Sequence, residues 1–258
     1  MATIYEESHE ELSEFVSWFN RHKGFNPLVI GGWAVYHYNP YFESKDIDVI
    51  FEHPRKAWDP MLMEYFGAHG YQWLDKDKHA LVPGAPNLSL VQTFRKKAGG
   101  EYIDVDACSA SDPNLFHNPA YRGKEIPYAL SVERSVKVTI ARGKADYRVP
   151  RIEVLLLYKL KAYDDRDYRL KHAAAPKDVE YLTSKRDKDG ADVMALLDKK
   201  HCKQPVDFGE LNRLVDALQV RPMVRETVRR VLANQASLRQ YGQLTLEELS
   251  AELHGLLS

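Results

Sequence analysis

Two short stretches of the sequence decide the expected fold: residues 28–35, LVIGGWAV, and residues 44–51, SKDIDVIF. The first is an apolar run that ends at Gly31 and Gly32, before a segment compatible with a helix. The second alternates apolar and acidic residues, which is typical of a strand with one face in a core. The sequence therefore predicts a strand, a helix that begins at a glycine pair, and a second strand that presents two aspartates on one face.

The acidic residues of this strand have a counterpart later in the chain. Asp46 and Asp48 are two residues apart, and Asp104 and Asp106 repeat the spacing within EYIDVDAC at residues 101–108. Neighbouring carboxylates repel each other unless a cation lies between them, and Mg²⁺ is usually bound by one or two carboxylates together with substrate phosphates. The four aspartates are therefore predicted to bind Mg²⁺ or Mn²⁺, in a cluster that could hold two ions for in-line phosphoryl transfer. A lone Asp-x-Asp pair is more often a solvated strand edge, so the prediction depends on its context.

The glycine pair supplies part of that context. Glycines at the end of a strand and the start of a helix let backbone N–H groups approach phosphate oxygens with no Cβ in the way. We therefore expect the backbone at Gly31 and Gly32 to receive phosphate oxygens. Ser44 either contacts phosphate or simply begins the strand, and Lys45 is a further candidate for nucleotide binding.

The runs at residues 30–35 and 44–49 resemble the signature of the DNA polymerase β-like nucleotidyltransferase superfamily. In that signature, a glycine pair at a helix start is followed by Asp-x-Asp, and a carboxylate from a neighbouring strand completes the site. The resemblance implies metal ligands Asp46 and Asp48, triphosphate contacts Gly31 and Gly32, and a third carboxylate from Asp104 or Asp106. The third carboxylate is also expected to help activate the incoming hydroxyl.

Two later segments are similar to the third and fourth motifs of the AbiE-type nucleotidyltransferases, which include abortive-infection toxins and related toxin–antitoxin enzymes. They are LLLYKLKA at residues 155–162 and KDGADV at residues 188–193. The resemblance implies that Lys159, Asp189 and Asp192 help to bind the nucleotide. The chain departs from the family at Gly190, where an apolar residue is usual.

The chemistry of phosphoryl transfer favours the lysines independently, because the β and γ phosphates need cations. Residues two apart on a helix diverge by about 200°, so Lys159 and Lys161 are not expected to face inward together. Lys159 shares its face with apolar residues and is the preferred candidate. For Lys161, a solvated helix face is as good an interpretation as a functional one.

Composition limits the class of protein. The chain has 258 residues, 44% of them apolar, and a net charge of −1, so any surface that binds nucleic acid must be local. Cys108 and Cys202 are far apart and lack metal-ligand spacing, which suits a reducing compartment. No apolar run is long enough to cross a bilayer. These features predict a soluble, cytoplasmic protein with no membrane partner.

The expected class is α+β, with an N-terminal nucleotidyltransferase domain at 1–149 and an all-helical C-terminal domain at 150–258. The N-terminal domain should hold a mixed β-sheet flanked by helices. Strands are predicted at 28–30, 45–51, 71–74, 88–94 and 102–108, the last two joined by a hairpin turn. Helices are predicted at 8–23, 33–38, 56–70, 152–168, 188–199, 207–218, 222–235 and 245–257. The first helix is expected to begin with a capping box of Ser8 and Glu11.

The predicted activity is transfer of a nucleoside monophosphate from an NTP to an acceptor hydroxyl, with release of pyrophosphate. The acceptor is left open between tRNA or another RNA, a protein side chain, and a small molecule such as an aminoglycoside. The AbiE-like motifs favour RNA or protein, a toxin-like role and an antitoxin partner. The alternative is a non-catalytic nucleotide-binding or regulatory module of the same fold. Arg221, Arg225 and Arg229 could contact an RNA backbone, although a solvated helix face is the preferred interpretation.

Overall fold

The computed structural model describes residues 2–21, 26–75, 79–81, 89–140, 145–245 and 247–248. The chain forms two compact units. Unit 1 comprises Met1–Tyr36, Phe42–Asp112 and Pro127–Arg151, and unit 2 comprises His37–Tyr41, Pro113–Ile126 and Ile152–Ser258. The domain boundary expected after residue 149 stays a prediction.

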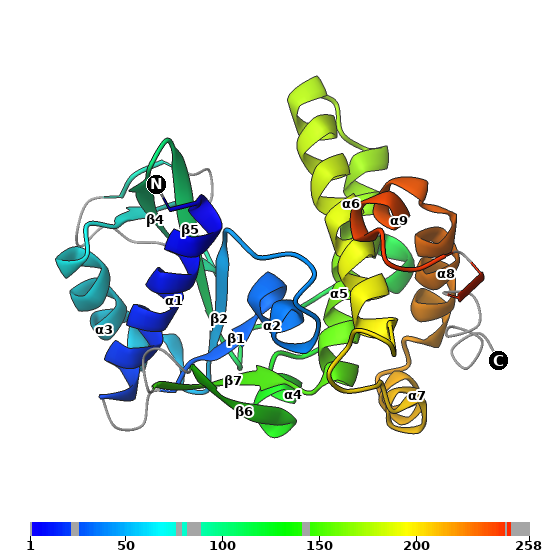
Figure 1. The fold of residues 1–258 in the computed structure, drawn as a ribbon, viewed down its shortest axis with the longest axis horizontal. Coiled ribbons are helices and arrows are strands. Elements are labelled where there is room, and N and C mark those ends of the chain that lie inside the picture. Colours follow the sequence, from blue (N-terminus) through cyan, green and yellow to red (C-terminus); the bar gives the residue numbers. More distant parts are fainter. Residues whose placement is uncertain are drawn as a thin grey trace. The chain divides into compact units, whose positions relative to one another are not determined.

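Unit 1 is built on a seven-stranded sheet with the strand order β3-β4-β5-β2-β1-β7-β6 (Figure 1). The strands are β1 (Leu28–Ile30), β2 (Ile47–Phe51), β3 (Gln72–Leu74), β4 (Gln92–Ala98), β5 (Glu101–Ser109), β6 (Ser135–Ile140) and β7 (Ala145–Pro150). β1 pairs with β7, and β2 with β5, in parallel; the other neighbours are antiparallel. The predicted α+β class and mixed sheet are confirmed.

The described helices of unit 1 are α1 (Ile4–Asn20), α2 (Gly31–Tyr38), α3 (Arg55–Ala68) and α4 (Ala129–Glu133). The last two residues of α2 belong to unit 2. α1 starts four residues earlier than predicted, with a capping box of Thr3 and Glu6. Ser8 cannot cap it, because Ser8 is buried inside the helix and accepts a hydrogen bond from Trp33 Nε1 at 3.2 Å.

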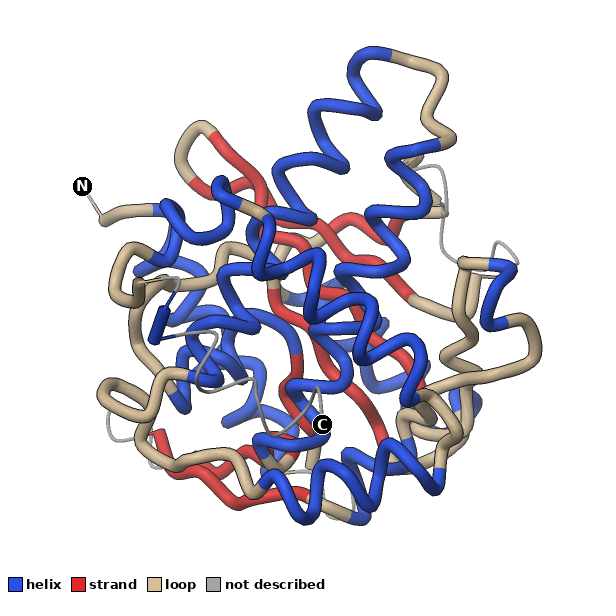
Figure 2. Tube along the Cα trace, turned by 90° about the vertical axis from the view of Figure 1, so that its right-hand side faces the viewer, coloured by secondary structure: helices blue, strands red, loops and turns tan. Residues whose placement is uncertain are grey.

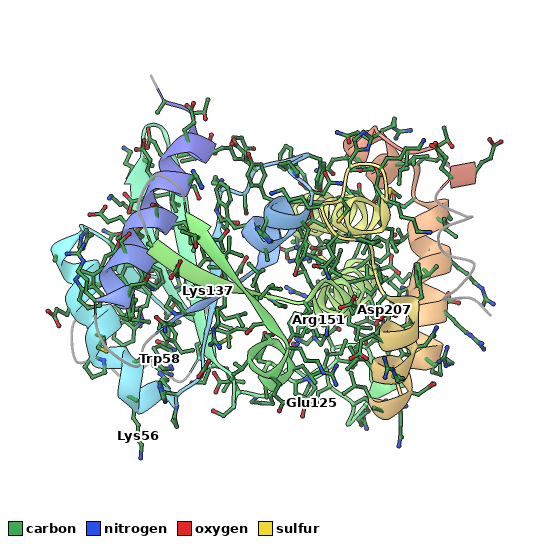
Figure 3. The ribbon with its side chains drawn as sticks, turned by 60° about the horizontal axis from the view of Figure 1, so that its bottom comes forward. Lys56, Trp58, Glu125, Lys137, Arg151 and Asp207 are labelled. Atoms are coloured by element: carbon green, nitrogen blue, oxygen red, sulfur yellow. The ribbon has the colours of Figure 1, made fainter. Side chains whose placement is uncertain are left out.

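One face of the sheet is covered by an aromatic core. Phe15 of α1 packs on Tyr65 and Phe66 of α3, with ring centroids 5.3 and 5.7 Å apart, and Phe66 stacks on Phe94 of β4 at 4.1 Å. Trp58 of α3, labelled in Figure 3, stacks on the β2 residue Phe51. Because side chains alternate along a strand, the acidic residues of β2 and β5 point to the opposite face.

Unit 2 is helical where the structure describes chain 152–245, as predicted. It contains α5 (Ile152–Lys171), α6 (Pro176–Leu197), α7 (Phe208–Ala217), α8 (Arg221–Ala233), α9 (Gln235–Tyr241) and, earlier in the chain, the short η1 (Pro119–Tyr121). α5 and α6 run side by side and are joined by a short loop (Figure 2). Asp207, labelled in Figure 3, caps α7, and its amide donates to Glu153 of α5 at 3.0 Å.

Several element boundaries differ from the sequence prediction. α6 begins at Pro176, twelve residues before the helix start that was predicted at residue 188. The helix expected at 222–235 is divided, because Asn234 leaves the helical conformation and caps α9. Strands β6 and β7 were not predicted. The helix expected at 245–257 lies mostly outside the described residues.

Within the part of the chain that the structure describes, none of the helices is both long and apolar enough to cross a membrane.

Candidate active site

Two of the predicted aspartates lie side by side in the middle of the sheet. Asp48 on β2 and Asp106 on β5 are register partners in the parallel pair. Both are partly exposed, whereas the residues that alternate with them are buried. On the other side of β5, Thr93 of β4 pairs with Asp106, and its hydroxyl donates to Asp106 Oδ1 at 2.5 Å. Thr93, Asp106 and Asp48 thus form one row across three strands.

A second row lies one pleat away and contains the other two aspartates. Arg95 of β4 pairs with Asp104 and donates twice, from Nε to Oδ1 at 2.7 Å and from Nη2 to Oδ2 at 2.8 Å. β2 begins at Ile47, so Asp46 precedes it rather than lying within the predicted strand. Hydrogen bonding to Asp104 raises the pKa of Arg95 above its ordinary value, and the charge of Asp46 adds to the effect. Asp46 therefore lies within electrostatic reach of Arg95.

Gly31 is placed directly against Asp48. The last residue of β1, Ile30, is the register partner of Asp48, so α2 begins beside the carboxylate. Gly31 has φ +66°, and a Cβ added to it would lie 1.9 Å from Asp48 Oδ2. Both the left-handed backbone and the close approach require glycine. The predicted glycine and one predicted metal ligand are thus brought together, with Gly32 buried behind them.

Ser44 and Lys45 make contacts that support the strand. The buried Ser44 hydroxyl donates to the backbone oxygen of Asp46 at 2.9 Å. Lys45 Nζ lies 3.3 Å from Glu101 Oε2, and both side chains are well exposed. A role of these two residues in nucleotide binding stays a prediction.

Lys159 and Asp189 belong to a charged cluster inside unit 2. Lys159 Nζ lies 2.7 Å from Asp192 Oδ2 and 3.6 Å from Asp189 Oδ1, with all three side chains almost fully buried. Arg166 pairs with Asp189, and Lys188 Nζ lies 3.1 Å from Asp192. The Tyr41 hydroxyl donates to Asp192 at 2.6 Å. We call these residues the α5–α6 cluster: Tyr41, Lys159, Arg166, Lys188, Asp189 and Asp192.

Electrostatics in the α5–α6 cluster favour the charged form of Asp192 despite its burial. Burial acts to raise the pKa of Asp192, but the charges of Lys159 and Lys188 and the hydrogen bonds outweigh it and lower this pKa to about 2. Burial lowers the pKa of Lys188, and Asp192 opposes that change. Tyr41 could not be identified from sequence, because it precedes the acidic strand by several residues and has no charged pattern around it.

Lys161 is also buried, so the expectation that only one of the two lysines faces inward was wrong. Its Nζ lies 2.6 Å from Asp165 Oδ2 and 5.2 Å from the ring centroid of Phe116. Lys159 contacts α6, whereas Lys161 faces the segment that contains Phe116. The two lysine side chains point in different directions from α5, as helix geometry requires. Both are buried because other parts of unit 2 pack against α5 on more than one side.

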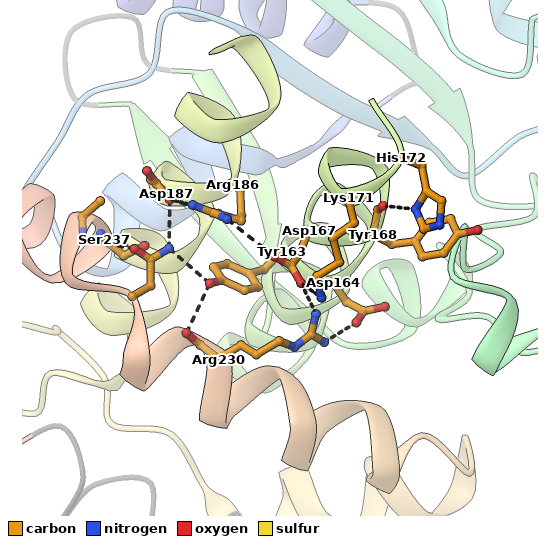
Figure 4. Close-up of polar contacts among 12 residues, drawn as sticks. Tyr163, Asp164, Asp167, Tyr168, Lys171, His172, Arg186, Asp187, Arg230 and Ser237 are labelled. Atoms are coloured by element: carbon orange, nitrogen blue, oxygen red, sulfur yellow. Dashed lines mark hydrogen bonds and ion pairs between the residues drawn. The ribbon is translucent and has the colours of Figure 1, made fainter. Parts of the chain in front are cut away.

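The arginine stripe on α8 is dispersed. Arg221 pairs with Asp216 at 2.8 Å, and Arg229 is largely exposed. Arg230, outside the stripe, joins α8 to α5 through Asp164 and Asp167 (Figure 4). These contacts support a solvated face with one structural arginine beside it.

The geometry bears directly on metal binding. Among the residues that the structure describes, no group of three or more His, Cys, Asp or Glu side chains is arranged to hold a metal ion. The four aspartates are instead divided between two rows. The pair Asp48 and Asp106, with Gly31 against it, fits the one or two carboxylates that Mg²⁺ takes from a protein when phosphates supply further ligands.

No protein-family model and no curated protein sequence matches the chain. The solved structures that are similar to it at low identity include the following three. An antigenic nucleotidyltransferase-like protein from Paracoccidioides brasiliensis has 13% identity and a TM-score of 0.40, over 85% of this chain and 93% of that one. ANT(2")-Ia in complex with adenylyl-2"-tobramycin has 16% identity and a TM-score of 0.39, over 84% and 98%. A candidate nucleotidyltransferase from H. pylori has 16% identity and a TM-score of 0.37, over 98% and 93%. Likenesses of this size leave the activity of the chain to be argued from its own residues.

Proposed function

We propose that the chain is a metal-dependent nucleotidyltransferase that transfers a nucleoside monophosphate from an NTP to an acceptor hydroxyl. The observation that carries the proposal is the pairing of Asp48 with Asp106 on one sheet face, with Asp48 lying against the glycine that begins α2. Paired carboxylates suit a hard divalent cation, and backbone N–H groups at a helix start suit phosphate.

Each residue of this row has a role in the proposal. Asp48 and Asp106 would hold Mg²⁺ or Mn²⁺, which when bound supplies positive charge to the triphosphate and to the departing pyrophosphate. Gly31 and Gly32 would receive phosphate oxygens. Thr93 would hold Asp106 in orientation through its hydrogen bond.

Asp106 is favoured over Asp104 as the third carboxylate of the expected site. Both oxygens of Asp104 accept hydrogen bonds from Arg95, and binding a cation there would cost that bidentate pair. Asp106 has the register position next to Asp48 instead. Asp46 lies within electrostatic reach of Arg95, and Ser44 donates to its backbone oxygen. Asp46 would join Asp48 as a metal ligand only if its side chain moved away from Arg95.

The reaction is a single displacement at phosphorus. The oxygen of the acceptor hydroxyl forms a bond to the α-phosphorus, and the bond from that phosphorus to the bridging oxygen breaks. Pyrophosphate leaves with the electron pair, and the hydroxyl proton passes to Asp106. The protein contributes mainly position and charge, as in other phosphoryl transfers.

The α5–α6 cluster supports a nucleotide-binding role for Lys159 within unit 2. Its three cations, Lys159, Arg166 and Lys188, exceed its two carboxylates by one positive charge. Asp189 would orient Lys159 and Arg166 rather than contact phosphate itself, because a carboxylate repels an anion. The departure at Gly190 has a packing cause, since a Cβ there would lie 2.2 Å from Ser237 Oγ.

The test is transfer of label from each α-³²P-labelled NTP, with Mg²⁺, to three acceptor pools: total RNA, protein and an aminoglycoside. The wild-type chain is expected to label one pool. Asp48→Asn and Asp106→Asn should each reduce the rate about a hundredfold or more, the scale expected when charge stabilisation at a transferring phosphate is lost.

Asp104→Asn is the matched control, because it changes the same chemical group one pleat away and should retain most of the activity. Transfer that survives Asp48→Asn would contradict the proposal. Absence of transfer to every pool, with NTP binding intact, would instead favour a nucleotide-binding module of this fold.

The toxin-like role and the antitoxin partner rest on the AbiE-like motifs alone. Growth of cells that express the chain from an inducible promoter tests the toxin-like role. A toxin should arrest growth, and Asp48→Asn should relieve the arrest; an equally toxic variant would separate toxicity from catalysis.

A further inference from the structure

The sheet face that carries Asp106 continues outward along β5 to a third row. Two residues beyond Asp104 on this face lies Tyr102, and Lys97 of β4 is its register partner, just as Arg95 is the partner of Asp104. Directly opposed residues in an antiparallel pair have Cβ atoms about 5 Å apart. Moving away from the aspartate pair, the face therefore changes from acidic to basic and aromatic.

These outer side chains are arranged as a platform. Tyr102 is 48% exposed, whereas tyrosine side chains in folded proteins are usually more buried. The Arg95 guanidinium lies 5.1 Å from the centroid of the Tyr102 ring, within the range of a cation–π contact. Lys97 is exposed beside them. We call Tyr102, Arg95 and Lys97 the β4–β5 platform.

We infer that the β4–β5 platform binds the acceptor and that the acceptor is a single-stranded nucleic acid. The inference rests on the proposed function, since it names the substrate class of the same site. Exposed aromatic rings stack on bases without regard to sequence, and Lys97 would neutralise a phosphate. Arg95 keeps its pair with Asp104 and holds the Tyr102 ring through the cation–π contact. A polycationic acceptor such as an aminoglycoside would be repelled by Lys97.

The distance along the strand fits such an acceptor. Tyr102 is four residues from Asp106, which corresponds to about 13 Å along β5. A stacked strand of nucleic acid has one phosphate about every 3.4 Å. With a terminal hydroxyl at Asp106, the base on Tyr102 would lie about four steps away and belong to roughly the fifth nucleotide, counting the terminal one as the first. Binding should therefore strengthen up to about five nucleotides and change little beyond.

The experiment is fluorescence anisotropy with the full chain and labelled oligonucleotides of increasing length, with Mg²⁺ present and NTP omitted. Tyr102→Ala should weaken binding about tenfold, as expected for loss of one stacked base, and Tyr102→Phe should bind like wild type. Lys97→Ala should lower the slope of log affinity against log salt by about 0.7, the value for one phosphate contact with a single strand.

Unit 2 offers a matched control. Tyr181 is 58% exposed, and Lys185 Nζ lies 5.9 Å from the centroid of its ring. The chain therefore has a second exposed pair of an aromatic ring and a cation, distant in sequence from β5. Tyr181→Ala should leave oligonucleotide binding unchanged. Thermal unfolding of each variant verifies that the fold is retained, and Tyr102→Phe keeps the comparison valid if Tyr102→Ala is destabilised.

The inference is overturned if the wild-type chain does not bind the oligonucleotides, if Tyr102→Ala binds within twofold of it, or if Tyr181→Ala loses as much. Parallel arms with RNA and DNA of one sequence distinguish the two sources of a single strand. The anisotropy experiment omits NTP, so it measures binding separately from catalysis. If binding depends on Tyr102 but the label-transfer assay shows no transfer, only the proposed function is defeated. Transfer to a protein or small molecule that is indifferent to Tyr102→Ala defeats only this inference.

Discussion

At the scale of single residues, Gly31 combines a backbone conformation that favours glycine with a close approach to the proposed metal ligand Asp48. Its left-handed φ and its approach to Asp48 leave no room for a Cβ. Gly31→Ala should cost about 1–2 kcal/mol from the backbone conformation and displace Asp48, so that transfer falls by more than the loss of stability explains. Urea unfolding and the label-transfer rate measure the two effects.

Gly67→Ala provides the comparison for Gly31→Ala. Gly67 lies in α3 with nothing within 4 Å of an added Cβ. The replacement should stabilise the chain by up to about 1 kcal/mol and leave transfer unchanged. If Gly31→Ala kept wild-type activity, the close contact with Asp48 would have no functional meaning.

The residue scale also shows how far a sequence can identify a site. The spacing of Asp46, Asp48, Asp104 and Asp106 marked the acidic face, but not its division into two rows. That division depends on the register of β2 against β5 and on Arg95 and Thr93, which come from a third strand. Neither residue has a sequence pattern that connects it to the aspartates.

At the scale of elements, the contact between α6 and α9 explains the unusual Gly190. A Cβ on Gly190 would meet Ser237 Oγ at 2.2 Å and Ser237 Cβ at 2.8 Å, and Figure 4 shows Ser237 among the polar contacts around Tyr163. Gly190→Ala should destabilise the fold by about 1–3 kcal/mol through overpacking. Adding Ser237→Gly should recover part of that loss in urea unfolding; a double variant with fully additive losses would refute the contact.

The buried Asp192 gives the α5–α6 cluster a pH dependence. Its pKa is about 2 in the folded chain against an ordinary 3.8. A carboxylate with a lowered pKa contributes its full stability above the ordinary value, and loses it as pH falls toward the folded value. Asp192→Asn should cost about 3 kcal/mol at neutral pH, with the difference from wild type shrinking between about pH 4 and pH 2.

Urea unfolding across that pH range measures the difference. Asp178→Asn, in the exposed first turn of α6, is the matched control and should stay within about 0.5 kcal/mol of wild type. A difference for Asp192→Asn that is the same at every pH would show that the carboxylate charge is not what stabilises the cluster.

Element prediction succeeded where periodicity was strong and failed where context decided. The helical segments of α3, α5 and α7 and the alternation of β2 and β5 were visible in the sequence. β6 also alternates, with Val136, Val138 and Ile140, but no motif drew attention to it. The early start of α6 follows from Pro176, which suits the first turn of a helix.

At the scale of the whole molecule, unit 2 draws on distant parts of the chain. Asn39 donates to the backbone oxygen of Ala195 and to the Tyr241 hydroxyl, both at 2.9 Å, and Tyr41 donates to Asp192. No periodicity could reveal this, because residues 37–41 are short and contact helices far along the sequence. Besides Ile152–Ser258, unit 2 includes His37–Tyr41 and Pro113–Ile126.

A fragment of residues 150–258 tests that organisation. It lacks Asn39, Tyr41 and the segment with Phe116, so several buried polar groups would lose partners, each at a cost of about 1–3 kcal/mol. We expect no cooperative thermal transition by circular dichroism for the fragment, against a clear one for the full chain. A cooperatively folded fragment would show that the N-terminal segments are dispensable.

The central claim is that Asp48 and Asp106 hold a divalent cation beside Gly31. The most direct measurement is anomalous X-ray scattering from crystals soaked with Mn²⁺ and a nonhydrolysable NTP. The account predicts a manganese peak about 2.1 Å from a carboxylate oxygen of both Asp48 and Asp106, with Arg95 still bound to Asp104. A peak on Asp104 with Arg95 displaced, or no manganese at Asp48, would contradict it.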